Sequence, residues 1–213
     1  MHVSENIFTI ILILTLCVII IAGFYISTKT FSLENFVPIA NINSDKMNTS
    51  IHQLLINYVS YLHEYMLKAI GASSSDSKSQ NLVPLVSKLY TNQTQIAQEL
   101  NTLYPNMYSI LEPQFQNMAG IYIKLLNANI KRNIHDIDQF TNDLANNTKN
   151  ISLALHRVNP RYDYETLNTM ISRVTIALNF DMGIIMSSAP DANAYTNSKN
   201  QAIALADFLL KNK

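Results

Sequence analysis

Hydrophobic and polar positions divide the chain into an N-terminal apolar run and a long amphipathic remainder. The run covers residues 7–28, IFTIILILTLCVIIIAGFYIST, and contains no charged side chain. A helix of that length is roughly 33 Å long, which is enough to cross a hydrocarbon core of about 30 Å. We therefore expect an N-terminal tail at residues 1–6, a single transmembrane helix at 7–28 and a connector at 29–44.

The run has the character of an uncleaved signal-anchor. The preceding residues, MHVSEN, include no Lys or Arg, and the run is longer than the apolar part of a secretory signal. Ala22-Gly23-Phe24 is a poor cleavage site. Cys17, the single cysteine, lies inside the run. We interpret it as a small apolar residue in preference to a palmitoylation site.

After the connector, apolar residues recur at steps of three and four, which is the period of an amphipathic helix. Five helices are expected, followed by a shorter sixth, at about 45–70, 81–104, 106–132, 133–158, 164–187 and 197–210. Their apolar stripes are interpreted as core, and no segment has the alternation of a strand. The pattern predicts an all-α fold in which residues 45–213 form an antiparallel bundle of five to six helices.

Several residues should mark where these helices begin and end. Ser44 is a plausible N-cap of the first helix, and Gly71 is placed just after its end. Pro84 falls in a first turn, where proline is tolerated, and Pro113 marks the start of the third helix or a kink in it. The stripe of the fourth helix is expected to comprise Ile134, Ile137, Leu144, Ile151, Leu155 and Val158.

Composition supports long helices and excludes one class of partner. Only four glycines and no tryptophan are present, which disfavours a turn-rich β fold. The formal net charge is zero without a basic block, so a nucleic-acid surface is not expected. Asparagine and isoleucine are abundant, as in proteins encoded by AT-rich genomes.

The orientation of the anchor is only weakly determined by sequence. Lys29 and Lys46 follow the run and no Lys or Arg precedes it, which favours a cytosolic domain. Large C-terminal domains are nevertheless translocated largely regardless of charge, and we therefore slightly prefer an extracytoplasmic or lumenal domain. Four Asn-x-Ser/Thr sequons, at Asn48, Asn92, Asn146 and Asn150, are as many as chance would place in so asparagine-rich a chain.

Residues that could carry chemistry do not form a recognisable site. No Asp or Glu has a histidine three residues later, so the ligand pairs of a di-metal bundle are missing. His52 and His63 share a helix face but lie about 16 Å apart, too far for one ion. His135 and Asp138 are interpreted as solvated surface. We expect no catalytic, metal or cofactor-binding residues.

Asp181 is the one acidic residue that lies against the apolar stripe of its helix. A buried carboxylate could be functional because burial raises its pKa. An edge position, or a partner such as Arg173 or Lys124, is the preferred explanation. Arg157 and Arg161 flank Pro160 and are expected to serve the end of the preceding helix.

Two segments share a pattern at a separation of 55 residues. Leu89, Asn92, Ile96, Leu100 and Pro105 correspond in order to Leu144, Asn147, Ile151, Leu155 and Pro160. A duplicated helix–proline–helix hairpin would explain the correspondence and would give the domain pseudo-twofold character. Chance remains the alternative, because leucines at heptad-like spacing align easily.

These segments also carry a resemblance to a known family. The resembling stretches are Leu89-Tyr90-Thr91-Asn92-Gln93 with Ile96, then 147–160, then Asp191 with Ala194-Tyr195, and finally Leu205-Ala206-Asp207-Phe208-Leu209. Over about residues 48–213 the chain resembles small all-helical proteins of spore-forming bacteria that have no established activity. The anchor and the asparagine-rich composition would suit a giant-virus or other AT-rich-genome version.

The resemblance implies a fold of paired helical hairpins and no particular reaction. The family often has a histidine early in each helix after the repeat proline, and these positions fall near Ala119 and Arg173 here. His63, within Leu62-His63-Glu64, is similar to the first histidine of the family. An activity or metal that depended on all of those histidines is therefore not expected in this chain.

Taken together, these patterns predict a membrane-anchored, non-enzymatic structural or protein-interaction protein, of a virion or a cell envelope. Its expected partners are the lipid bilayer, through residues 7–28, and an unidentified protein. A helical-bundle enzyme or metalloprotein and a ligand-sensing ectodomain are the alternatives.

Overall fold

A computed structural model describes residues 51–74, 82–187 and 191–211, all of which belong to one compact unit, Ser44–Lys213. The predicted tail, transmembrane helix and connector lie outside the described residues, as do Ser44 and the first residues of the first predicted helix.

The described residues form six helices and no strand, which confirms the all-α prediction for this part of the chain. The helices are α2 (Ile51–Ser74), α3 (Val83–Leu103), α4 (Tyr108–Ile130), α5 (Ile134–Val158), α6 (Tyr164–Met186) and α7 (Ala192–Lys211).

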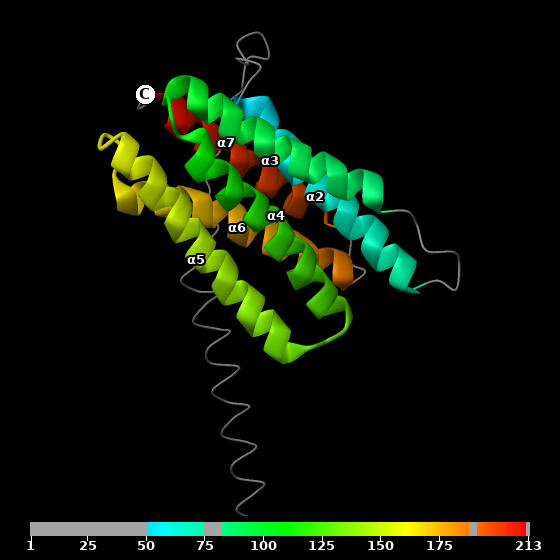
Figure 1. The fold of residues 1–213 in the computed structure, drawn as a ribbon. Helices are drawn as coiled ribbons and strands as arrows, with labels where there is room; N and C mark the ends of the chain where they lie inside the picture. The colour runs from blue at the N-terminus through cyan, green and yellow to red at the C-terminus, as the bar shows by residue number, and fades with distance from the viewer. Residues whose placement is uncertain (1–50, 75–81, 188–190, 212–213) are drawn as a thin grey trace, which may run out of the picture. The chain divides into compact units, whose positions relative to one another are not determined.

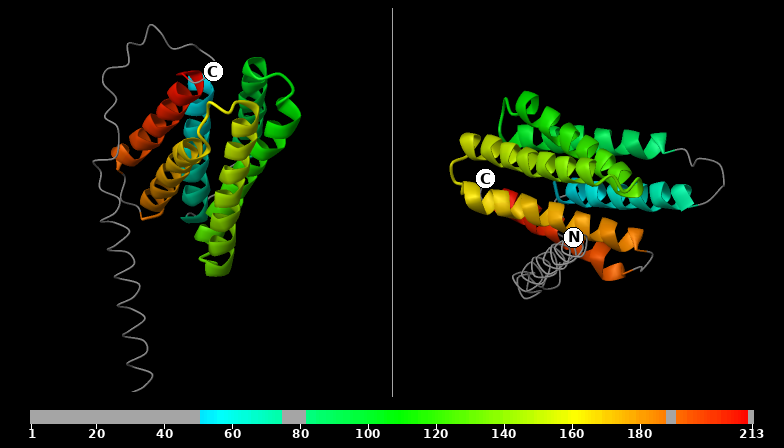
Figure 2. Two further views of the ribbon diagram at one scale, coloured as in Figure 1. Left: turned by 90° about the vertical axis from the view of Figure 1, so that its left-hand side faces the viewer. Right: turned by 90° about the horizontal axis from the view of Figure 1, so that it is seen from below.

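The six helices form an antiparallel ring around one hydrophobic core. Consecutive helices run in opposite directions and pack against each other, as Figure 1 shows. The first described helix, α2, also packs against α7 and α6, so the ring closes between its two ends. Two views at right angles show α2, α6 and α7 on one side of the bundle and α3, α4 and α5 on the other (Figure 2). Short connections explain this order, because they favour antiparallel neighbours.

Helix ends differ from the sequence prediction in three places. Gly71 lies inside α2, which continues to Ser74. Of the two alternatives for Pro113, a helix start or a kink, the start is wrong, because α4 begins five residues earlier at Tyr108 and includes the proline in its second turn. The last helix is not short, since it begins at Ala192 and has 20 residues. Pro84 occupies the first turn of α3, as predicted.

The apolar stripes form the core, with exceptions at the ends of α5. Leu144, Ile151 and Leu155 are buried. Ile134 and Val158 were expected in the same stripe, but they are 74% and 39% exposed. They are the first and last residues of α5. The prediction extended the apolar stripe to both ends of the helix and so overestimated the burial of the end residues, because terminal turns can extend past the neighbouring helices.

The two proline-containing turns, after α3 and after α5, share two backbone features but differ in a third, since Asn106 has a φ of 74° and its equivalent Arg161 has no positive φ. Tyr104 and Asn159 are both extended, as the residue before a proline prefers. Each accepts a hydrogen bond at its carbonyl oxygen from the residue three positions later, Met107 or Tyr162. The turns also touch, because the Asn159 side-chain amide donates to the Tyr104 hydroxyl at 3.1 Å.

One described helix, α6, is long and apolar enough to cross a membrane by length and composition alone. Core helices of soluble proteins meet the same criterion. Within the bundle α6 packs against α5, α7 and α2 and buries Leu167, Leu178 and Asp181.

Candidate functional site

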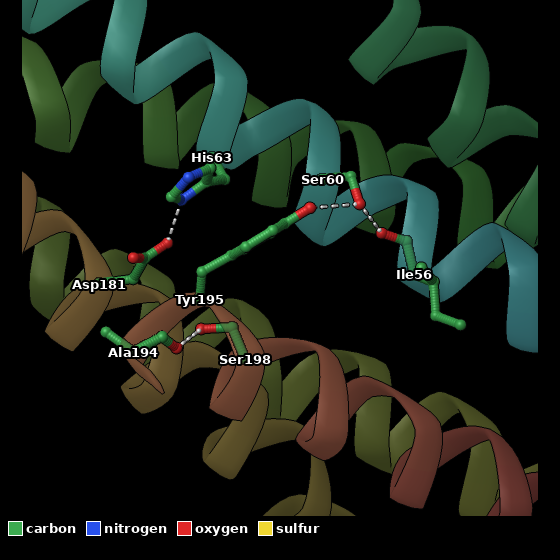
Figure 3. A network of polar contacts seen from close by, with 7 residues as sticks. All are labelled: Ile56, Ser60, His63, Asp181, Ala194, Tyr195 and Ser198. Atoms are coloured by element: carbon green, nitrogen blue, oxygen red, sulfur yellow. Dashed lines mark hydrogen bonds and ion pairs between the residues drawn. The ribbon is translucent and has the colours of Figure 1, made fainter. Parts of the chain in front are cut away.

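The most distinctive polar cluster of the bundle joins α2, α6 and α7. His63 on α2 donates its Nδ1–H to the Oδ2 of Asp181 on α6, at 2.6 Å. The Asp181 side chain is 2% exposed and that of His63 is 20% exposed. The carboxylate is therefore inside the bundle, while one edge of the imidazole faces solvent. Figure 3 shows the pair bridging the two helices.

Tyr195 on α7 completes the cluster. Its ring stacks on the His63 imidazole, with centroids 4.0 Å apart and planes inclined by 18°. Its hydroxyl donates to the Ser60 Oγ at 3.0 Å, and this Oγ donates in turn to the Ile56 carbonyl oxygen at 2.8 Å (Figure 3). On α7, the Lys199 ammonium lies 4.2 Å from the centre of the Tyr195 ring, which is within cation–π range.

This arrangement orients a histidine but does not activate a nucleophile. With Nδ1 engaged by the carboxylate, Nε2 is the imidazole nitrogen left to exchange a proton. Ser60 lies one helical turn away, yet its hydroxyl hydrogen is directed to the Ile56 carbonyl. Nucleophilic catalysis requires a hydrogen bond from the nucleophile to the base. Within the described residues, the cluster therefore links the three helices α2, α6 and α7 by hydrogen bonds and ring stacking.

Asp181 thus differs from the sequence prediction in both position and partner. It is buried instead of lying at an edge, and it pairs with His63 instead of Arg173 or Lys124. The two residues are 118 positions apart in the chain. The sequence singled out each residue for a different reason, since Asp181 interrupts an apolar stripe and His63 lies in a motif that resembles the family's. Only the tertiary fold brings the two residues together.

A second histidine on α2 makes a similar but more exposed pair. His52 Nε2 lies 2.7 Å from Oδ1 of Asp207 on α7, whose side chain is 68% exposed. His135 and Asp138 are both at the surface, as expected. Across the described ranges, no three His, Cys, Asp or Glu side chains are grouped closely enough to hold a metal ion.

The centre of the bundle contains polar groups beside a small cavity. Gln93 is fully buried, and neither its Oε1 nor its Nε2 has a hydrogen-bond partner among the described residues. It lines the cavity together with Tyr58, whose hydroxyl is also buried and unpartnered. Burial raises the pKa of Tyr58 well above its ordinary value. The cavity measures about 30 Å³, which admits one or two water molecules and is too small for an organic ligand.

A surface groove between α4 and α5 has a defined hollow that is lined by both aliphatic and polar side chains. Ile110, Leu153 and Val158 line it and are 50%, 37% and 39% exposed. The hollow has a volume of about 390 Å³, and Arg157 also lines it. Among the described residues, no carboxylate lies within ion-pair distance of Arg157, which sits in the last turn of α5 as expected.

Comparisons of the chain with family models, with curated proteins and with solved structures found no match.

Proposed function

We propose that this protein is a membrane-anchored, non-enzymatic component of a cell or virion envelope whose helical bundle binds another protein. The observation that carries the proposal is the groove between α4 and α5. Three exposed aliphatic side chains line its hollow, beside an arginine. Exposed apolar clusters with a polar rim are typical of protein-binding surfaces.

The chemistry of the groove favours one kind of occupant, an amphipathic helix of a partner protein. A groove between two neighbouring helices suits the apolar face of a third helix, whose aliphatic side chains would contact Ile110, Leu153 and Val158. Arg157 adds a requirement for charge, because it would pair with a carboxylate on that helix. Such a pair fixes the register of the docked helix more than it strengthens the binding.

The membrane part of the proposal rests on residues 7–28. Isoleucine, leucine, phenylalanine and valine each favour the bilayer centre by about 0.3–0.6 kcal/mol, and no charged residue opposes them. The apolar α6 is already accounted for by its packing in the bundle. A single N-terminal anchor with the bundle on one side of the membrane is therefore the proposed topology.

The bundle is further proposed to contain a duplicated hairpin, with α3–α4 and α5–α6 as the two copies. Asn92 and Asn147, equivalent in the repeat, are both buried and donate their amides to carbonyl oxygens of the preceding helix, at Leu54 and Gln114. The backbone hydrogen bond that the turns at Tyr104 and Asn159 share supports the same alignment. The resemblance to the helical family of spore-forming bacteria belongs to this proposal, since that family is expected to share the paired hairpins.

Site-specific photocrosslinking of the full chain in the membranes of its host tests the groove. A photoreactive residue in place of Leu153 should give one dominant adduct with another protein, whereas the same residue at Leu67, which is 49% exposed on α2, should not. Arg157→Glu should abolish the adduct. Lys149→Glu, the same charge reversal at an exposed position of α5, should leave it intact.

Three outcomes would contradict the groove proposal. Adducts of equal yield from positions 153 and 67 would mean that the groove has no special affinity. An adduct that survives Arg157→Glu would remove the charged pair from the account. An adduct within the same chain, to residues 29–50, would make the groove an internal docking site instead of a binding surface for a partner.

The two alternative functions are less well supported by the geometry. Acid–base chemistry at His63 has one observation in its favour, the orientation of the imidazole by Asp181. If it operated, His63→Gln would abolish a measurable hydrolytic or proton-transfer activity of the purified chain, and we expect no such activity to exist. A ligand-sensing domain that enclosed its ligand in the core would need a larger cavity, since the core cavity of about 30 Å³ is too small for an organic ligand.

A further inference from the structure

We infer that the bundle folds on the cytosolic side of its membrane, in a compartment where asparagine side chains are not glycosylated. The observation behind this inference is the burial of one sequon acceptor, Asn92. The inference rests on the proposed membrane anchor at residues 7–28 and does not depend on the groove between α4 and α5. It replaces the slight preference for a lumenal domain that the sequence allowed.

Asn92 has no room for a modification at its amide nitrogen. The residue lies on α3, faces α2 and is 1% exposed. Its Nδ2 donates a hydrogen bond of 3.1 Å to the Leu54 carbonyl oxygen of α2. The contact between α2 and α3 is one of those that close the helical ring in Figure 1.

N-glycosylation would act on this same nitrogen. The reaction forms a bond between Nδ2 and the anomeric carbon of a lipid-diphosphate-linked oligosaccharide, breaks the bond from that carbon to the diphosphate and removes one proton from Nδ2. A bulky, hydrated oligosaccharide would then have to lie between two packed helices. Protein interiors are close-packed and do not accept such a group without separation of the helices.

Folding does not protect the site, because the transfer takes place while the chain enters the lumen. Asn92-Gln93-Thr94 would be extended and accessible at that stage. A domain that folds in the lumen would therefore risk a modification that prevents α3 from docking on α2. Folding in the cytosol avoids this risk, since the transferase acts only on the lumenal side.

The other sequons of the described residues provide a contrast. Asn146 and Asn150 are exposed on α5 and could carry oligosaccharides without disturbing the core. Asn147, the repeat equivalent of Asn92, is buried but does not begin a sequon, because Lys149 stands two positions later. Asn92 is thus the one acceptor in the described residues whose modification conflicts with the fold.

Charge near the anchor points to the same side. Lys29 and Lys46 follow the apolar run, on the side that leads into the bundle. Positively charged flanks are retained in the cytosol, so the flank that leads into the bundle should stay there. The burial of Asn92 and the distribution of lysines are independent observations that agree.

The first test determines the natural topology. The full chain is translated in the presence of sealed microsomes, treated with external protease and analysed with and without endoglycosidase. We expect an unglycosylated chain that stays in the membrane pellet after a carbonate wash and whose bundle is accessible to the protease from outside the vesicles. A protected bundle carrying oligosaccharides at Asn146 or Asn150 would overturn the inference.

The second test forces the bundle into the lumen by means of a cleavable signal sequence that replaces residues 1–28, because the apolar run at 7–28 would otherwise stop transfer and leave the bundle in the cytosol. Wild type and Thr94→Ser, which both keep the sequon, should be modified at Asn92 and lose the protease-resistant core. Thr94→Ala removes the sequon, leaves Asn92 in place and should keep the resistant core. All three chains should fold when they are made in the cytosol.

Each remaining result of the second test would contradict the inference. A resistant core that contains glycosylated Asn92 would mean that the interface tolerates the oligosaccharide. A folded lumenal wild type with unmodified Asn92 would mean that the transferase does not reach the site. Misfolding of Thr94→Ala in the lumen would mean that something other than the oligosaccharide excludes the bundle from that compartment.

Discussion

A buried carboxylate is stable only when hydrogen bonds replace the water that it has lost. At Asp181 the replacement comes from His63, on a different helix. Tyr195 covers the imidazole from a third helix, so the pair is packed as well as hydrogen-bonded. At the scale of single residues, this contact is where α2, α6 and α7 depend on one another most directly.

Removal of either His63 or Asp181 should therefore cost more free energy of unfolding than the contacts of the removed side chain alone, because the remaining partner loses its hydrogen bond. We expect Asp181→Ala to lower the free energy of unfolding by about 1–3 kcal/mol, because it leaves the His63 donor without its acceptor. Urea denaturation of Asp181→Ala, His63→Ala and the double variant should give a coupling energy of about 1 kcal/mol or more. Effects that add within about 0.3 kcal/mol would mean that the two side chains do not stabilise each other.

Adjacent core residues Asn92 and Gln93 should respond in opposite ways to the same substitution. Gln93→Met removes an amide without a described partner and keeps the side-chain length, so stability should be unchanged or rise by about 1 kcal/mol. Asn92→Met removes the hydrogen bond to the Leu54 carbonyl and should lower stability by about 1 kcal/mol. Urea midpoints of the two variants measure the contrast. Equal destabilisation would mean that Gln93 is hydrogen-bonded in solution.

At the scale of helices and turns, the proline turns determine where α4 and α6 begin. The helices that follow the two turns start differently, since α6 has a side-chain cap and α4 does not. The Asp163 carboxylate accepts hydrogen bonds from the Thr166 backbone N–H at 2.8 Å and from its hydroxyl at 2.7 Å. Both hydrogen bonds lower the pKa of Asp163, and the bond from the Thr166 hydroxyl has the larger effect.

The lowered pKa makes the cap of α6 sensitive to acid. A carboxyl group whose pKa is lower in the folded state stabilises the fold above its unfolded pKa and loses that effect as the pH falls through the folded value. Asp163→Ala should therefore lower the melting temperature at pH 7 and have less effect at pH 2. Asp163→Asn keeps a cap that does not titrate and serves as the control. An equal effect of Asp163→Ala at both pH values would contradict the assignment.

Most helices could be predicted from the sequence because helix formation is a local property with a clear period. The last helix was expected at about residue 197, but it begins at Ala192, and Ala194 in its first turn packs into the core as well. Gly71 was placed just after the first helix, although a glycine inside a helix costs only about 1 kcal/mol. The pairing of His63 with Asp181 could not be predicted, since no periodic pattern states which helices of a bundle touch.

At the scale of the whole molecule, tyrosine hydroxyls tie helices together inside the ring. The Tyr122 hydroxyl on α4 donates to the Thr175 carbonyl oxygen of α6 at 3.0 Å. The Tyr162 hydroxyl donates to the Leu209 carbonyl oxygen of α7 at 2.7 Å. Burial raises the pKa of both phenols, and at Tyr162 the hydrogen bond with Tyr104 raises it further.

These raised pKa values predict cooperative unfolding in alkali. A phenol whose pKa is higher in the folded state contributes its full stability below the unfolded value of about 10 and loses it as the pH rises further. Between about pH 10 and 13, helical circular dichroism should fall together with a delayed rise in tyrosinate absorbance. Tyr122→Phe should shift that transition upward. Complete tyrosine ionisation in a bundle that keeps its helicity would contradict the burial of these hydroxyls.

The central claim is that residues 7–28 anchor a folded helical bundle in a membrane, and extraction with alkaline carbonate tests it most directly. The full chain, expressed in its host, should remain in the membrane pellet after the wash. A chain that lacks residues 7–28 should appear in the supernatant and should show helical circular dichroism after return to neutral pH. Release of the full chain by carbonate, or retention of the shortened chain in the pellet, would contradict the account.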